Sequence, residues 1–191
     1  MSSTKKKTAY TSIVVLVVFV FFVFIFLYFN PVKFVENIGI HNSYLLAFIV
    51  SLFGGVSAGG AISFISVLTT LVLGGLNPLW LGLIAGVSLS VGDMFIFFLG
   101  SKGRQYIVGR LDTTIRMVAE AYYKNRLLSI FTPVIAYVYM AFTPLPNDIL
   151  LVFLSFIDYP INKMRLIIFL GDMTFALMLT TLVSKGVLLF I

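Results

Sequence analysis

The sequence predicts an all-α integral membrane protein, and three observations lead to this class. Sixty per cent of the 191 residues are hydrophobic and only 10% are charged, which lies far outside the balance of a globular domain. The mean hydropathy is +1.10. Long apolar runs are separated by short segments rich in Pro, Gly and basic residues. We expect three spanning helices, two re-entrant helical hairpins in an inverted-repeat arrangement and one cytoplasmic amphipathic helix.

The composition argues against several classes of function. The chain has no cysteine, so neither a disulfide framework nor a thiolate metal site is expected. His41 is the single histidine and is expected at a loop or membrane interface, so we expect no metal and no cofactor. The net charge of +6 is attributed to lipid headgroups and the positive-inside bias, because the basic residues flank apolar runs. Nucleic acid is therefore not an expected partner.

The amino-terminal part is expected to be a cytoplasmic tail followed by the first spanning helix. Residues 1–12 include three consecutive lysines. The apolar run 13–29 is longer than the core of a typical cleavable signal peptide and would form a helix about 26 Å long. Residues 13–43 are thus assigned to a retained helix and an outer loop.

Two apolar runs, 44–76 and 127–157, have lengths between one crossing and two. As helix each reaches about 46–50 Å, against about 60 Å for two crossings. Each is broken near its middle, and we interpret each as a re-entrant hairpin, although two short full crossings would preserve the same topology. The residues at the breaks are Gly54, Gly55, Gly59 and Gly60 in the first run and Thr143, Pro144 and Pro146 in the second.

The remaining apolar runs, 79–100 and 166–184, have the length of single spanning helices and complete a membrane domain over residues 44–191. Between them, residues 101–126 carry six Lys or Arg against two acids, which places this segment in the cytoplasm. Apolar residues recur at helical spacing over 105–126, which favours an amphipathic helix on the membrane surface. A connector helix packed on the bundle is the alternative.

Three carboxylates lie inside apolar runs: Asp93, Asp148 and Asp172. Each is about 10–15 Å from the cytoplasmic end of its run, so the three could share one layer. Carboxylates that face one cavity would compete for a proton, which suits a proton-coupling role. The structural alternative is that Asp93 and Asp172 cap backbone amides of a neighbouring hairpin. Asn147 and Asp148 could likewise cap the helix that follows Pro146.

An anionic headgroup is the expected ligand of the second break. A helix amino terminus attracts phosphate, and Arg104, Arg126 and Lys102 at the inner rim are candidate contacts. These cations could equally be ordinary positive-inside residues. No enzyme is expected, because a pair of Asp residues is the single hydrolytic geometry left and the sequence around them lacks the usual aspartyl-protease context.

The order of elements resembles the DedA superfamily, also called the VTT-domain or SNARE-associated family. Three matches carry the resemblance: the Gly-rich run 85–103 with Gly92-Asp93, the Pro-centred run 142–148, and Gly171-Asp172 in the last helix. Gly-Asp-Met occurs at 92–94 and again at 171–173, as an inverted repeat would require. The acidic residue of the family's first hairpin and the arginines of its second have no counterpart here, so those roles are not carried over.

The resemblance implies a flippase or scramblase in the cell membrane that moves a phosphate-bearing lipid, a polyprenyl phosphate or a phospholipid, between leaflets. It implies anionic headgroups as partners and protons as a coupling ion, with the amino terminus in the cytoplasm. A homodimer is compatible with so small a unit. The alternatives are a proton- or cation-coupled exporter of a small solute and a membrane scaffold that transports nothing.

Overall fold

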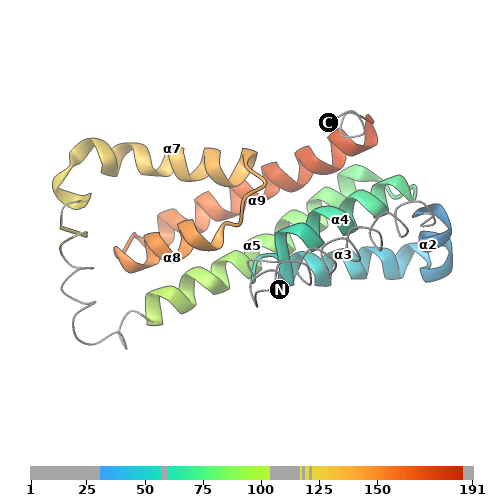
Figure 1. Cartoon of the computed structure of the whole chain (residues 1–191), viewed down its shortest axis with the longest axis horizontal. Helices are drawn as coiled ribbons and strands as arrows, with labels where there is room; N and C mark the ends of the chain where they lie inside the picture. Colours follow the sequence, from blue (N-terminus) through green and yellow to red (C-terminus); the bar gives the residue numbers. More distant parts are fainter. Residues whose placement is uncertain (1–30, 57–59, 104–116, 118, 121, 187–191) are drawn as a thin grey trace, which may run out of the picture.

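The computed structural model describes residues 31–56, 60–103, 117, 119–120 and 122–186. Every regular element in this part is a helix, so the all-α prediction is confirmed for these residues (Figure 1). The predicted helix 13–29, Gly59, Arg104 and most of 105–126 lie outside the described residues. The helices are α2 (Pro31–Ile38), α3 (Ile40–Gly54), α4 (Gly60–Leu73), α5 (Pro78–Gly103), α7 (Arg126–Phe142), α8 (Asp148–Phe156) and α9 (Ile161–Ser184).

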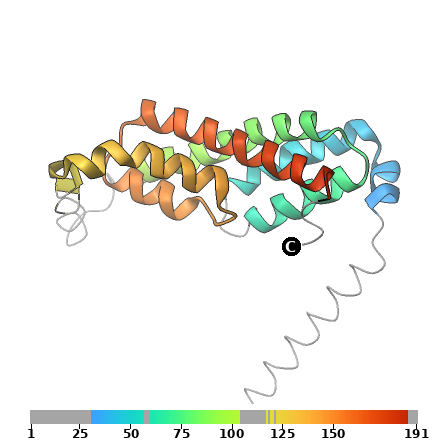
Figure 2. The same cartoon turned by 90° about the horizontal axis from the view of Figure 1, so that it is seen from above.

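Helices α5 and α9 form the long axis of the molecule. Both are long and apolar enough to cross a membrane, and α2 with α3 would count as a third candidate if their 100° bend were taken as one broken span. Their 26 and 24 residues correspond to about 39 and 36 Å. They pack side by side and run in opposite directions (Figures 1 and 2). They include the predicted runs 79–100 and 166–184.

Small residues let α5 and α9 approach closely. A Cβ at Gly82 would lie 2.7 Å from Oγ1 of Thr180, and one at Gly86 would lie 3.0 Å from Cα of Met173. Such close approach is the usual role of glycine between membrane helices, where dispersion contacts replace the hydrophobic effect as the main attraction.

The shorter helices form two antiparallel pairs, which we call the first hairpin (α3 and α4) and the second hairpin (α7 and α8). Each hairpin runs along one half of the α5–α9 pair, and the turns between their legs face each other near the middle (Figure 1). The leg α3 packs on α5 and α4 on α9, whereas α7 packs on α9 and α8 on α5. At the turn of the first hairpin, a Cβ at Gly60 would lie 2.8 Å from Cα of Gly54, so the legs meet backbone to backbone.

Buried apolar side chains form two clusters, one within each half of the molecule. Helix α5 contributes Leu89 to the first cluster and Phe97 to the second, and Asp93 lies midway between them. In α9, Asp172 likewise lies four residues from a member of each cluster. The two carboxylates therefore occupy the polar junction between two apolar cores.

The sequence predicted a loop between the first spanning helix and Tyr44, but the described residues of this segment, 31–43, are almost entirely helical. The chain there forms α2 and the first turn of α3, because Pro31 pre-sets a helical φ and Gly39 takes a φ of +85° that ends α2 and turns the chain. The amide of Gly39 still donates to the carbonyl of Val35, 2.8 Å away. The first hairpin consequently begins at Ile40, earlier than predicted.

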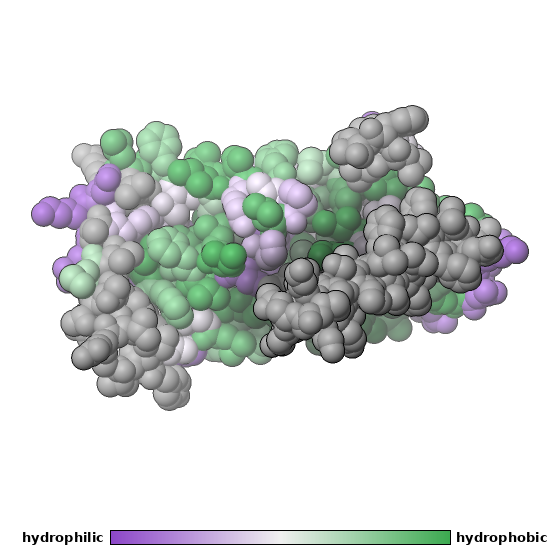
Figure 3. All heavy atoms as spheres, in the orientation of Figure 1, coloured by the Kyte–Doolittle hydropathy of each residue, from purple (hydrophilic) through white to green (hydrophobic). Residues whose placement is uncertain are grey.

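The coloured part of the visible surface is mostly apolar, with a pale hydrophilic patch near its centre and the most hydrophilic residues at its two ends (Figure 3). The exposed apolar side chains include Val87, Val91 and Phe95 on α5 and Val134 and Val138 on α7. Such a band around a bundle has the character of a surface that contacts lipid rather than water.

Candidate functional site

The amide group of Asn147 joins two buried carboxylates that come from different helices. Its Nδ2 atom donates to Oδ2 of Asp93 in α5 at 2.8 Å and to Oδ1 of Asp172 in α9 at 3.4 Å. Asp93 is 1% exposed and Asp172 is fully buried. We call Asp93 and Asp172 the carboxylate pair. The structure thus brings together three residues that are distant in sequence and that the sequence marked as candidates.

The local sequence explains how Asn147 reaches this position. Pro144 and Pro146 cannot continue α7, so the chain crosses between the two legs as an extended link. Tyr139 supports the link, because its hydroxyl donates to the carbonyl of Pro146 at 3.1 Å. Thr143 closes the end of α7 with a hydroxyl bond of 2.6 Å to the carbonyl of Tyr139.

The capping interpretation of Asn147 is wrong. Asn147 occupies the N-cap position of α8, but its side chain makes no capping hydrogen bond. Its φ of −70° and ψ of −21° are helical, whereas a capping residue is usually extended, and its Nδ2 donates to the carboxylate pair. Among the described residues, the hydrogen bonds to Asp93 and Asp172 come from the side-chain amide of Asn147. Residues 57–59, at the tip of the first hairpin, lie outside the described part, so capping of that tip by Asp93 stays a prediction.

The remaining oxygens of the pair are in unusual surroundings. Oδ2 of Asp172 is buried and has no hydrogen-bond partner among the described residues. A Cβ at Gly55 would lie 2.5 Å from Oδ1 of Asp93 and 2.8 Å from the Asp93 amide nitrogen. The turn of the first hairpin therefore lies directly against Asp93 at Gly55. Any larger residue at this position would push the turn and Asp93 apart. Asp93 touches the turns of both hairpins.

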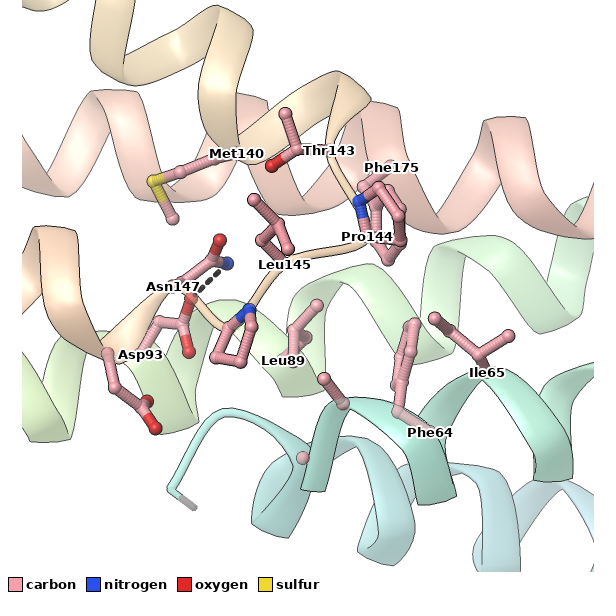
Figure 4. Close-up of a pocket in the computed structure, with 14 residues that line it drawn as sticks. Phe64, Ile65, Leu89, Asp93, Met140, Thr143, Pro144, Leu145, Asn147 and Phe175 are labelled. Carbon is pink, nitrogen blue, oxygen red and sulfur yellow. Dashed lines mark hydrogen bonds between the residues drawn. The ribbon is translucent and has the colours of Figure 1, made fainter. Parts of the chain in front are cut away.

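A small cavity of about 30 Å³ lies where the two turns meet (Figure 4). Asp93, Asn147 and Asp148 give it a polar side, and Thr143, Pro144 and Pro146 of the second hairpin also line it. One water needs about 10–15 Å³ of such space, so the cavity has room for two or three waters and not for a headgroup or a solute. The rest of the lining is Gly54, Ala61, Phe64, Ile65, Leu89, Met140, Leu145 and Phe175.

The predicted cationic contacts are not brought to this cavity in the part of the chain that the structure describes. Lys102 is exposed near the end of α5, with its Nζ 5.7 Å from the centre of the Phe98 ring. Arg126 begins α7, at the far end of that helix from the turn. Lys102 does not line the cavity, whereas the side chain of Arg126 and all of Arg104 lie outside the described part of the structure.

Sequence reasoning missed Tyr139 and Met140, which support and line the second turn. Their roles could not be predicted from their distance to Pro146, because a tyrosine and a methionine in an apolar run are usually lipid-facing or core residues. The described residues include no group of three or more side chains suited to hold a metal ion. What the site can do is bind protons, or exchange its hydrogen bonds when the hairpin turns move.

Comparisons of this chain with protein-family models, with curated proteins and with solved structures find no match.

Proposed function

We propose that this protein is a membrane transporter in which protonation of the carboxylate pair is coupled to movement of the two hairpins, and that its cargo is a phosphate-bearing lipid. The observation that carries the proposal is the bridge from Asn147, at the break of the second hairpin, to carboxylates in both long helices. Buried ionisable groups in membrane helices are costly and are a feature of ion pathways and proton relays.

The helix lengths support two re-entrant hairpins rather than extra crossings. The legs α3, α4, α7 and α8 contain 15, 14, 17 and 9 residues, which correspond to about 22, 21, 25 and 13 Å. A hydrocarbon core of about 30 Å is longer than each of them. Broken helices survive at membrane depth where their free backbone groups are buried in protein or face water, as they are where these turns meet.

The packing supports an inverted repeat. Each unit is a hairpin followed by a long helix, and in each unit the first leg packs on the long helix of its own unit while the second leg packs on that of the other. Gly92 faces α3 and Gly171 faces α7. In both copies of Gly-Asp-Met, the glycine therefore lies where the first leg of the same unit packs on the long helix. Transporters of this plan bind their ligands where the discontinuous helices of two repeats meet.

The carboxylate pair is suited to carry a proton. Two negative charges on one amide in an apolar core would be held at a cost of several kcal/mol each, and a single shared proton relieves most of that cost. The cavity is too small for a cargo, so loading requires the turns to separate. An aspartyl hydrolase would hold its water between the two carboxyl groups, where this protein has an amide nitrogen.

Lipid exchange in liposomes tests the function. Full-length protein is reconstituted with a fluorescent phospholipid or polyprenyl phosphate, and the fraction accessible to an external quencher is followed with and without a pH gradient. We expect faster exchange than in empty liposomes, with a loss of at least tenfold for Asp93→Asn and for Asp172→Asn. Exchange at the rate of empty liposomes from a well-folded wild-type protein contradicts lipid transport and favours a scaffold.

A second candidate is a proton-coupled exporter of a small neutral or cationic solute. The specific observation is the cavity lining, in which the charged residues among those described are Asp93 and Asp148. Such a lining repels an anionic headgroup and attracts a cation. Proton-driven uptake of ethidium into the same liposomes, without lipid exchange, distinguishes this candidate from the first.

A further inference from the structure

We propose that Asn147 sets the ion specificity of the carboxylate pair, restricting the site to protons and excluding Na⁺ and other metal cations. The inference deepens the proposed function by naming the ion that the pair binds, and it rests on that function only for the coupling role of the ion.

The position of the Asn147 amide carries the argument. Metal cations at the breaks of discontinuous helices are bound by oxygen atoms, from carboxylates and unwound carbonyls. A cation shared by Asp93 and Asp172 would lie between Oδ2 of the first and Oδ1 of the second. That place holds Nδ2 of Asn147, at 2.8 and 3.4 Å from the two oxygens. An amide nitrogen offers two hydrogens and no acceptor, so it repels a cation.

The free oxygen of Asp172 is an independent indication that the ligand is a proton. Oδ2 is buried, belongs to a fully buried residue and lacks a partner among the described residues. Protonation of this oxygen removes the cost of an uncompensated buried negative charge and leaves Oδ1 as acceptor of the Asn147 bond. A metal ion at the same oxygen would need several further oxygen ligands, about six for Ca²⁺.

Among the described residues, few further side-chain oxygens adjoin the pair. The cavity of about 30 Å³ adjoins Asp93 and not Asp172, and it has room for two or three waters at about 10–15 Å³ each. Asp148, from α8, is the other titratable residue on its described lining. On the opposite side, Gly55 presents backbone to Asp93 and brings no side chain.

The test replaces the amide by a carboxylate. Asn147→Asp has nearly the same shape and puts an oxygen where the donor was. Full-length protein in detergent is melted at one ionic strength in NaCl, in KCl and in N-methyl-D-glucamine chloride, and in the last salt with added CaCl₂. We expect equal wild-type midpoints in every salt. The melting midpoint of Asn147→Asp should rise by about 5–10 °C, relative to N-methyl-D-glucamine chloride alone, at a metal-cation concentration 100 times the dissociation constant.

The matched control is the exchange variant Asn147→Asp with Asp172→Asn. It has the wild-type charge and again places an amide beside the remaining carboxylates, so its midpoint should not respond to metal cations. If Asn147→Asp does not fold, Asn147→Ser replaces it, because its hydroxyl oxygen also opens the position to a cation. A cation-dependent midpoint in the wild type overturns the inference, as does its absence in both Asn147→Asp and Asn147→Ser. The melting assay measures cation binding and not transport, so the inference can be refuted while the liposome assay still supports the proposed function, and the reverse.

Discussion

Gly92 is the position where a single methyl group should separate the first hairpin from the long helices. A Cβ at Gly92 would overlap the carbonyl oxygen of Leu52 in α3 and lie 3.2 Å from Cα of Gly55. Both contacts are to backbone, so no rotamer change relieves them and α3 must move. Overpacking of this kind costs about 1–3 kcal/mol, and we expect the upper end.

Replacing glycine inside a helix also gains about 1 kcal/mol of helix propensity, so the comparison needs a control in the same helix. Gly103, the last residue of α5, provides it, because a Cβ there would have no neighbour within 4 Å among the described residues. At about 2–4 °C per kcal/mol for a chain of this size, Gly92→Ala should melt about 6–12 °C below Gly103→Ala. Circular dichroism at 222 nm in detergent measures both midpoints.

Gly171→Ala extends the comparison to the second unit. A Cβ at Gly171 would lie 2.7 Å from the Cβ of Met140, a side-chain atom that can shift only with its helix. The variant should therefore melt between the other two. Equal midpoints for Gly92→Ala and Gly103→Ala would refute the reasoning, since they would mean that α3 does not rest on Gly92.

Two further predictions concern single hydroxyl groups and use the same melting assay. Ser88→Ala removes the hydrogen bond from Oγ to the carbonyl of Phe48 in α3 and should lower the free energy of unfolding by about 1 kcal/mol. Ser101→Ala loses only a hydrogen bond within α5 and should leave stability nearly unchanged. A larger loss of stability for Ser101→Ala than for Ser88→Ala contradicts a stabilising bond between α3 and α5. Tyr159→Phe removes a buried hydroxyl that has no partner among the described residues, so it should leave stability unchanged or raise it by about 1 kcal/mol. Tyr137→Phe breaks the hydrogen bond with Thr174 and should lower stability by a similar amount. A large loss of stability for Tyr159→Phe would contradict an unpaired Tyr159 hydroxyl.

The helical class and the presence of two long apolar helices could be predicted from the sequence, because long apolar runs ended by Pro, Gly and charge have few other solutions. Their bounds were less accurate, since α9 begins at Ile161 and not at Leu166, and α5 continues to Gly103. The breaks at Gly54 and at Thr143 were visible for the same reason: glycine and proline interrupt helices through backbone properties that need no tertiary context. The early start of the first hairpin was not visible, because its polar first turn at His41 and Asn42 resembles a loop.

The residues of the candidate site could be predicted from the sequence, but the hydrogen bonds between them could not. Depth along each run suggested that Asp93 and Asp172 could share a layer, since this follows from helix rise alone. The direction of the Asn147 side chain does not follow, because an asparagine before a helix has a local partner in the backbone amides of the first turn. Tertiary bonding to two carboxylates outweighs that local choice here, and bonds to charged acceptors are the stronger kind.

The two turns contribute unequally to the polar junction. In the described residues of the first turn, the backbone of Gly55 lies against Asp93, so a change in the protonation of Asp93 alters mainly the packing at Gly55. The second turn meets the pair through the Asn147 amide, whose two bonds are strongest when both acceptors are charged and weaken when one carboxylate takes a proton. If protonation moves a hairpin in this protein, the second hairpin is the one that responds first, because its attachment to the long helices is the one that a proton directly changes.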